Sequence, residues 1–416
     1  MKVKYIYDPI HGPISLQGVL LDLIGHPLVQ RLWGIRQTGM AHLVFPGSSH
    51  TRLEHSLGAL WVVREMSECL DLEEGEAERV QVAALLHDIG HTPFSHSLEP
   101  SLVEAAGTNH EARTVQLITG DIPEEMVPFG QGIPGYAPGP LRELLARHGM
   151  NARDIAALLS LGPERARKPY LSEILHGTID ADRLDYLIRD AHYTGVAHGV
   201  IDASRLLATM QVRRAHIAFA EKGRAAVEGF LLGRGLMYSS VYCNKTVRIA
   251  EGMLQSAVER SPGFPGTGRA LLSFTDGQLL AALEGGGGRS AEMARRLQAR
   301  QLYKSGFVIQ GAVRREIARL HRRPADRRVL EDDFATQLGG RPGDVLLDLP
   351  MPLQLPGEDL RIVDEEGNER FLLANDEVLS HLVQRSPIPW QLAVYCLPRL
   401  RTTVQRRGPA LLDRLL

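Results

Sequence analysis

The spacing of apolar residues predicts that most of residues 15–260 is helical. Within residues 57–70 and 76–89, apolar side chains recur at intervals of three and four, which places them on one face of an α-helix. Gly90 and Pro93 follow the second segment and are expected to close it. The same spacing predicts two further helices, over residues 171–191 and 225–258.

After about residue 329 the pattern changes to short runs that are typical of strands. Residues 344–349 and 360–363 are predicted strands, and a turn at 365–368 leads into a third at 371–373. A short helix over residues 377–384 and a last strand over 392–396 would complete a small α+β unit.

The chain is therefore predicted to be mainly α, with a helical core over residues 1–260 and an α+β unit over 329–416. A Gly-broken, Arg-rich helical segment over residues 261–328 separates them. Residues 121–140 are rich in Pro and Gly and are predicted to form an exposed excursion. At 416 residues, two units or one large unit with an appendage is expected.

Charge and cysteine content exclude several classes of protein. The 47 Lys and Arg residues nearly balance 49 Asp and Glu, a formal net charge of −2, so no general attraction to nucleic acid or to an anionic membrane follows. The arginine-dense residues 289–328 fit an interface or a phosphate-binding segment, and nucleic-acid binding is not favoured. There is no signal core or membrane-length apolar stretch. Because Cys69, Cys243 and Cys396 are odd in number and widely spaced, we expect free thiols in the cytoplasm.

Histidine is concentrated near the N-terminus: nine of the sixteen histidines fall within the first 110 residues, where an even spread would put about four. The densest piece is HDIGHTPFSH at residues 87–96, which follows the apolar run VAALL. His87 and Asp88 would thus emerge at the end of a buried helix, where ionisable groups are costly unless paired or coordinated. Imidazole and carboxylate together can bind Mn, Fe, Mg or Zn. For an isolated His-Asp dipeptide, the alternative is a pair that caps the helix.

Further metal ligands would have to come from elsewhere in the chain. His55 stands at the start of the first amphipathic helix, and residues 179–190 are crowded with carboxylates. His91 lies four residues after His87 and would share its helix face if the last turn persists. The acids and arginines of residues 179–190 equally fit solvated helical ion pairs.

The order His…His-Asp…Asp, carried by His55, His87-Asp88 and Asp182, resembles the signature of the HD phosphohydrolases. The flanking sequence is similar to one branch, the deoxynucleoside triphosphate triphosphohydrolases typified by the vertebrate SAM-and-HD-domain enzyme. The resemblance implies an HD-type helical core with a small C-terminal α+β appendage. The similar pieces are DPIHGPI (8–14), QRLWGIRQTG (30–39), FPGSSHTRLEHSLG (45–58), HDIGHTPFSH (87–96), NHE (109–111), IDADRLDYLIRDAHYTGV (179–196), LYK (302–304) and VYC (394–396).

The resemblance also implies roles for individual residues. The ligands of a divalent metal ion (Mn, Mg, Fe, Ni or Zn) would be His55, His87, Asp88 and Asp182. Arg52 would contact phosphate, a role that suits guanidinium geometry. The predicted catalytic residues lining the triphosphate are His91, His96 and His110, with His96 as general acid near its intrinsic pKa of about 6.5 and Glu99 orienting it.

The implied substrate-binding residues come from three regions of the chain. The chain departs from the branch at two positions nearby: Tyr238 stands where a histidine is usual, and Cys243 replaces an amide. Gly25 and Trp33 occupy places where activated members read a guanine, so we expect no requirement for dGTP. The predicted substrate contacts, besides Arg52, are Gln37 at the sugar 3′-hydroxyl, Arg183 and Arg234 at phosphate, Tyr186 and Asp190 at the sugar, and Tyr238 and Tyr242 near sugar or base.

The resulting prediction is a metal-dependent hydrolase that releases deoxynucleoside and inorganic triphosphate when water attacks the α-phosphate. Alternatives are an HD-type nucleotide phosphomonoesterase or phosphodiesterase, and a non-enzymatic nucleotide-sensing or nucleic-acid-binding protein with a degenerate HD site. The resemblance also implies a homo-oligomer, either a dimer or a tetramer.

Overall fold

A computed structural model gives the fold of the chain, and the prediction that it is mainly α is confirmed. Some predictions lie outside the described residues: nearly all of the Pro- and Gly-rich excursion, the arginines of residues 311–319, and the helix at 377–384. The structure describes residues 2–122, 139–160, 162–264, 270–310, 320, 323–349, 359–373 and 391–415.

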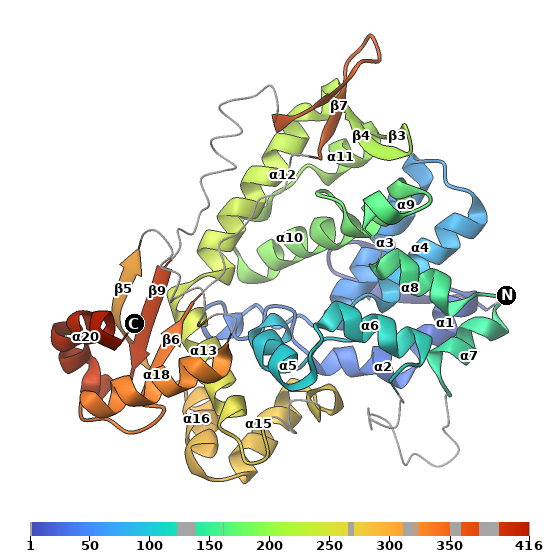
Figure 1. The fold of residues 1–416 in the computed structure, drawn as a ribbon. Coiled ribbons are helices and arrows are strands. Elements are labelled where there is room, and N and C mark those ends of the chain that lie inside the picture. The colour runs from blue at the N-terminus through green and yellow to red at the C-terminus, as the bar shows by residue number, and fades with distance from the viewer. Residues whose placement is uncertain are drawn as a thin grey trace.

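The helical body is built around α3 (Arg52–Cys69), which packs against α4 (Glu74–Leu86) and α10 (Ala181–Thr194) (Figure 1). Thr51 fixes the start of α3 through a capping box, in which its side chain and that of Glu54 satisfy each other's backbone N–H groups. The apolar face of these three helices is buried in one large core. This packing brings the first turns of α3 and α10 close to the end of α4.

The first two predicted helices are present with shifted ends. The helix predicted over residues 57–70 begins five residues earlier, at Arg52. The helix predicted over residues 76–89 ends earlier, at Leu86, and His87 is its C-cap. His87 and His91 therefore do not share a helix face, because the last turn does not persist.

The other two predicted helices are each divided. Residues 171–191 form α9 (Pro169–His176) and α10, because Asp180 caps the backbone N–H of Arg183 and starts a new helix. Residues 225–258 form α12 (Arg224–Met237) and α13 (Lys245–Glu259). A π-helical turn at Tyr238–Tyr242 separates this second pair.

The C-terminal strands belong to two different sheets. Strand β9 (Gln391–Cys396) lies between β5 (Lys304–Gln310) and β6 (Val345–Asp348), antiparallel to both. Strands β7 (Arg361–Val363) and β8 (Glu369–Phe371) instead extend the β3–β4 hairpin of the helical body, through parallel pairing of β7 with β4. The strands predicted over residues 344–349, 360–363 and 392–396 are confirmed. The strand predicted over residues 371–373 is wrong except at Phe371, because β8 starts directly after the turn, at Glu369, and ends at Phe371. The three-part division of the chain stays a prediction. Strand pairing crosses both boundaries of this division, because β4 pairs with β7 and β5 pairs with β9.

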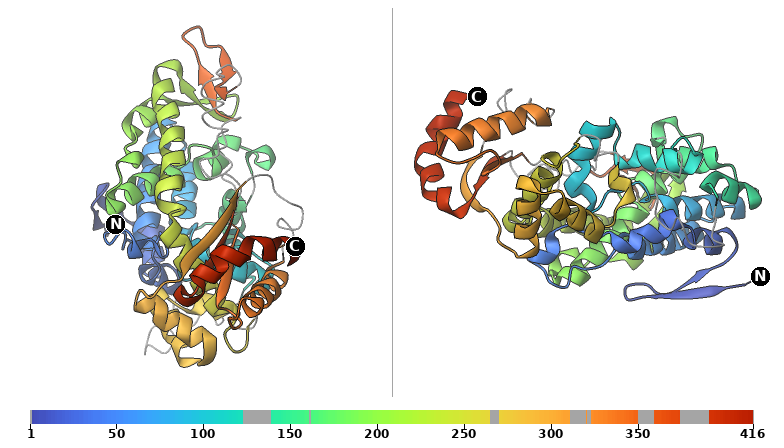
Figure 2. Two further views of the ribbon diagram at one scale, coloured as in Figure 1. Left: turned by 90° about the vertical axis from the view of Figure 1, so that its left-hand side faces the viewer. Right: turned by 90° about the horizontal axis from the view of Figure 1, so that it is seen from below.

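The sheet of β5, β9 and β6 is covered on both faces. Alternating residues of β6 and β9 enter one apolar cluster with α13 and α16, and the residues between them enter another with α18 and α20. Figure 1 shows α18 and α20 beside this sheet, and Figure 2 shows the N-terminal β1–β2 hairpin standing out from the opposite end of the molecule.

Among the described residues, no helix has both the length and the apolar character needed to cross a bilayer. The three cysteines are free, as predicted. The remaining elements are α1 (Gly18–Ile24), α2 (Pro27–Gln30), α5 (Glu99–Ala106), α6 (His110–Thr119), α7 (Leu141–Arg147), α8 (Ala152–Ser160), α11 (Ala203–Thr209), α15 (Asp276–Gly285), α16 (Gly288–Gln298), α18 (Pro324–Gln337), α20 (Arg401–Leu415), β1 (Lys4–Asp8), β2 (Gly12–Leu16), β3 (Met210–Arg213) and β4 (His216–Ala220).

Candidate metal centre and catalytic pocket

Two helix starts, distant in the sequence, bring one pair of predicted ligands together. His55 lies in the first turn of α3 and Asp182 in the first turn of α10. Oδ1 of Asp182 is 2.9 Å from Nε2 of His55. His55 is completely buried, whereas the side chain of Asp182 is 41% exposed and borders a cavity.

The end of α4 supplies the other pair. Nε2 of His87 lies 3.2 Å from Nε2 of His55 and 3.9 Å from Oδ1 of Asp182. Oδ1 of Asp88 is 3.2 Å from Nε2 of His87, and Oδ2 of Asp88 is 3.9 Å from Nε2 of His55. That second oxygen also accepts a 2.6 Å hydrogen bond from Arg52. Ligand atoms of His55, His87 and Asp182 therefore all lie within 4.8 Å of one another, and Asp88 lies beside the two histidines.

The orientation of the two imidazole rings shows what this cluster can hold. Nδ1 of His87 donates to the carbonyl of Ala84 at 2.7 Å, and Nδ1 of His55 faces the carboxylate of Asp185 at 2.8 Å. Each ring therefore turns its other nitrogen, Nε2, toward the other ring. The two ring nitrogens are 3.2 Å apart and can share this space through a proton or through a metal ion between them. The donor set, imidazole nitrogen with carboxylate oxygen, fits a divalent transition metal ion.

Without a metal ion, a proton takes this place. Burial alone would lower the pKa of His55, but Asp182 and Asp185 raise it to about 10. Desolvation raises the pKa of Asp182, but His55 more than offsets this and holds it below the usual value. A metal ion that binds here would displace the proton of His55.

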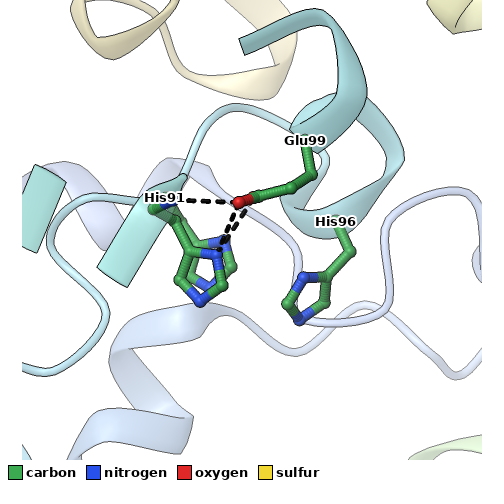
Figure 3. Close-up of side chains that lie close together, drawn as sticks. His91, His96 and Glu99 are labelled. Atoms are coloured by element: carbon green, nitrogen blue, oxygen red, sulfur yellow. Dashed lines mark hydrogen bonds and ion pairs between the residues drawn. The ribbon is translucent and has the colours of Figure 1, made fainter. Parts of the chain in front are cut away.

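A second cluster, formed by His91, His96, Glu99 and His110, lies beside the first, and its possible ligand atoms are all within 4.8 Å of one another. The ring of His91 stacks on His110 with centroids 3.9 Å apart. Nδ1 of His110 lies 3.0 Å from both carboxylate oxygens of Glu99. Figure 3 shows Glu99 and His96 reaching toward the same space as His91. Glu99 thus orients His110, whereas the sequence predicted that it orients His96.

The surroundings of His91 and His96 favour the neutral forms of these two side chains. Desolvation, and then the charge of Arg52, lower the pKa of both His91 and His96 well below the usual value. His96 is exposed, which lessens the effect of desolvation on its pKa. An ordinary pKa of about 6.5 for His96 therefore does not describe the ligand-free protein.

The turn that follows the His87–Asp88 pair is held close to α6. Its Gly90 donates a backbone hydrogen bond to the hydroxyl of Thr114 at 3.1 Å, and this hydroxyl donates to the carbonyl of His87 at 2.9 Å. A side chain at Gly90 would overlap the backbone of α6. Because Gly90 has no Cβ, the first residue of α6, His110, can pack against this turn.

A cavity opens over the two clusters and contains most of the predicted catalytic residues. Arg52 lies on its wall, where Nε donates to Ser95 at 2.6 Å while Nη1 binds Asp88. The lining residues are Gln37, Arg52, Ala59, Ala84, His87, Asp88, His91, His96, His110, Glu111, Thr114, Leu159, Leu175, His176, Ala181, Asp182 and Tyr186.

Five of the predicted substrate contacts do not line this cavity. Arg183 binds the carboxylate of Asp180 and the carbonyl of Gly177. Asp190 is almost completely buried, and its two oxygens contact His50 at 2.7 Å and the hydroxyl of Tyr242 at 2.5 Å. The ring of Tyr238 meets that of Tyr242 edge-on at 5.1 Å. Arg234 is buried, and its Nε and Nη1 have no hydrogen-bond partner among the described residues.

The structure adds residues that the sequence did not single out. Glu111, Thr114 and His176 line the cavity, and only Glu111 had a signal, in the NHE string. The alternative of solvated ion pairs over residues 179–190 does not describe Asp185 and Arg189. That pair is completely buried and lies directly behind His55.

This chain belongs to the HD phosphohydrolase superfamily. Residues 52–190 match the HD domain, and residues 201–413 match the HD associated region. The resemblance seen in the sequence is thereby confirmed at the level of the superfamily.

Among relatives, the chain is 36% identical over 264 residues to the Bacillus subtilis protein YwfO, covering 62% of this chain and 56% of YwfO. It is 34% identical over 260 residues to the Methanocaldococcus jannaschii protein MJ1154, covering 62% of this chain and 49% of that protein. It is 32% identical over 297 residues to the chicken deoxynucleoside triphosphate triphosphohydrolase SAMHD1, covering 63% and 46%. The chain thus spans about half the length of the curated relatives it matches.

Two solved structures resemble the whole fold. A phosphohydrolase from Bacteroides thetaiotaomicron superimposes with a TM-score of 0.73 at 25% identity, covering 96% of this chain and 100% of that one. A hypothetical protein from Aquifex aeolicus gives a TM-score of 0.73 at 26% identity, covering 97% and 99%.

Proposed function

We propose that this protein is a divalent-metal-dependent hydrolase of deoxynucleoside triphosphates that releases deoxynucleoside and inorganic triphosphate. The observation that carries the proposal is that His55, His87 and Asp182 come together, with Asp88 beside the two histidines, next to a cavity that is also lined by Arg52, His91, His96 and His110. Similarity to proteins named deoxynucleoside triphosphate triphosphohydrolase supports the choice of substrate.

These four residues would hold a divalent metal ion. When bound, such an ion lowers the pKa of a water molecule and polarises a phosphoryl oxygen. Arg52, held by Ser95 and Asp88, presents a fixed cation to the phosphates.

In this proposal His96 donates the proton to the departing 5′-oxygen. Its pKa is low in the ligand-free protein, so it is neutral before substrate binds. A bound triphosphate places negative charge beside the ring, which favours the protonated form. His110, held by Glu99 and stacked on His91, contacts the same phosphates.

For the nucleoside, Gln37 and Tyr186 are the predicted contacts that line the cavity. Tyr186 would pack against the sugar and exclude a 2′-hydroxyl, while His50 and Tyr242 hold Asp190 behind it. Arg234, with two buried nitrogens unpaired among the described residues, is suited to a phosphate, since an unpaired buried donor is costly until a ligand accepts from it.

The oligomer and the absence of a dGTP requirement also remain proposals. Trp33, which stands where activated members would read a guanine, is 48% exposed, and Tyr7 of the N-terminal hairpin is 81% exposed. Exposed aromatic side chains of this size are enriched at protein interfaces, which supports a homo-oligomer.

The test is incubation of the full chain with each dNTP and each matching NTP, with Mn²⁺ or Mg²⁺, followed by chromatography of the products. We expect inorganic triphosphate and deoxynucleoside from dNTPs, and little product from NTPs. Turnover should not depend on added dGTP. Orthophosphate as the only phosphate product would instead favour a phosphomonoesterase, and no turnover with any metal would favour a binding protein.

The Asp88→Ala variant is the matching control, since it removes one ligand and the partner of Arg52. It should lose activity while its circular dichroism spectrum is unchanged. A wild-type rate in this variant would remove Asp88 from the site.

A further inference from the structure

A buried carboxylate behind the candidate metal centre has no role in the function proposed above. Asp185 lies one turn after Asp182 on α10 and is completely buried. Its Oδ2 is 2.8 Å from Nδ1 of His55, and its Oδ1 is 2.6 Å from Nε2 of His11. Arg189 binds both oxygens, through Nε and Nη2, at 2.9 Å each.

This arrangement is anchored in the N-terminal hairpin. The third donor of Arg189 binds Asp8 at 2.7 Å. Asp8 also accepts from the backbone N–H groups of Ile10 and His11 at 2.9 Å, which shapes the turn between β1 and β2. The ring of His11 stacks on Trp61 of α3 with centroids 4.3 Å apart. The carboxylate of Asp185 is therefore fixed from three sides.

The helix that carries His55 leaves room for this carboxylate. Gly58 lies one turn after His55 on α3, and a Cβ at this position would overlap Asp185 and the guanidinium of Arg189. Only glycine at residue 58 lets the Asp185–Arg189 pair pack against α3 beside the ring of His55.

We propose that Asp185 is the residue that positions His55 for metal binding, and that Arg189, His11 and Asp8 hold it in place. By accepting the proton on Nδ1, Asp185 fixes the tautomer of His55, so that Nε2 faces Asp182 and His87 as a metal ligand. A carboxylate behind a ligating histidine orients the ring and increases its basicity. This inference rests on the metal-dependent function proposed above and extends the metal centre to the N-terminal hairpin.

The test is the affinity of the full chain for Mn²⁺ alone, measured from the electron paramagnetic resonance signal of the free ion. In Asp185→Asn the amide can donate to Nδ1 and turn His55 to the wrong tautomer. The dissociation constant for Mn²⁺ should rise roughly 10- to 100-fold, and the spectrum of the bound ion should change. An affinity equal to that of the wild type would overturn the proposal.

A matched control separates positioning from general loss of a buried ion pair. Glu259 on α13 is buried and binds Arg327 at 2.7 Å, and it does not line the cavity. Glu259→Gln should leave Mn²⁺ affinity at the wild-type value. An equal loss of affinity in both variants would mean that the effect of Asp185→Asn is structural, and the proposal would fail.

If Asp185→Asn does not fold, the His11→Phe variant tests the proposal in its place. It keeps the stacking on Trp61 and removes one donor to Asp185, so Mn²⁺ affinity should fall roughly 2- to 10-fold; unchanged affinity would contradict the proposal. A wild-type protein that binds Mn²⁺ but hydrolyses no dNTP would refute the proposed substrate and leave this inference standing.

Discussion

Gly90 gives the sharpest test of how the catalytic cluster is assembled. A Cβ added here would lie 2.6 Å from the backbone nitrogen of Thr114 and 2.7 Å from its hydroxyl oxygen, and would overlap the carbonyl of His110. These are mostly backbone atoms, so α6 itself must move. In Gly90→Ala the first turn of α6 should shift by roughly 1 Å to restore van der Waals separation.

The size of the effect follows from this displacement. Forcing an extra methyl group into a packed site costs about 1–3 kcal/mol of folding free energy. Moving His110 by about 1 Å relative to the metal ligands should lower kcat by about 100-fold, because misplacements of this size have effects of that order. The movement also strains the hydrogen bonds that link Gly90, Thr114 and His87.

The assay compares Gly90→Ala with Gly229→Ala for dNTP hydrolysis and for the free energy of unfolding in urea. Gly229 lies inside α12, and a Cβ there would meet nothing within 4 Å. Gly229→Ala should therefore keep wild-type activity and gain about 0.5–1 kcal/mol of stability. A Gly90→Ala rate within threefold of the wild type would refute the reasoning.

Three further predictions concern the surroundings of the site. Arg31 is completely buried and donates to the carbonyls of His91 at 2.7 Å and Phe274 at 3.2 Å, so Arg31→Met should lower both stability and kcat. Arg205→Met, which removes an exposed hydrogen bond to the carbonyl of Lys222, should change neither stability nor kcat. Equal effects of the two variants would contradict the inference that Arg31 holds the turn at His91 in place. Desolvation raises the pKa of Asp276 to about 6, so the folded state retains a proton that the unfolded state has released. The free energy of unfolding of the wild type relative to Asp276→Asn should therefore decrease as pH rises from about 4 to about 6 and stay level above pH 6. A difference between the two proteins that does not change with pH would contradict this prediction. Arg234→Gln removes a guanidinium whose Nε and Nη1 have no hydrogen-bond partner in the described part of the chain. It should raise KM for dNTPs about tenfold or more, since charged hydrogen bonds contribute about 1.5–3 kcal/mol; an unchanged KM and kcat would place Arg234 outside the substrate site.

The sequence predicted the helices because they depend on local pattern, and it predicted the candidate ligands from a local motif together with the resemblance to the HD phosphohydrolases. Apolar spacing predicted α3 and α4, and the string at residues 87–96 predicted His87 and Asp88 as candidate metal ligands, which the fold places side by side. The ends of the helices were predicted less accurately than their positions, because helix ends depend on side-chain capping. Asp180 starts a new helix at Ala181, which the periodicity over residues 171–191 does not reveal.

Contacts between distant segments were not predictable from one sequence. The pairing of β7 with β4 joins residues about 140 positions apart, and no local pattern specifies it. Asp185 and Arg189 read as an ordinary helical ion pair until the packing of α10 on α3 shows them buried behind His55. The low pKa of His91 likewise arises from burial and from the charge of Arg52, both of which depend on the fold.

The most direct test of the central claim is hydrolysis of a dNTP in ¹⁸O-labelled water with Mn²⁺, followed by mass spectrometry of the products. Attack of water on the α-phosphorus predicts one ¹⁸O atom in the inorganic triphosphate and none in the deoxynucleoside. Label in orthophosphate or pyrophosphate, with a nucleotide as the other product, would contradict the proposed reaction.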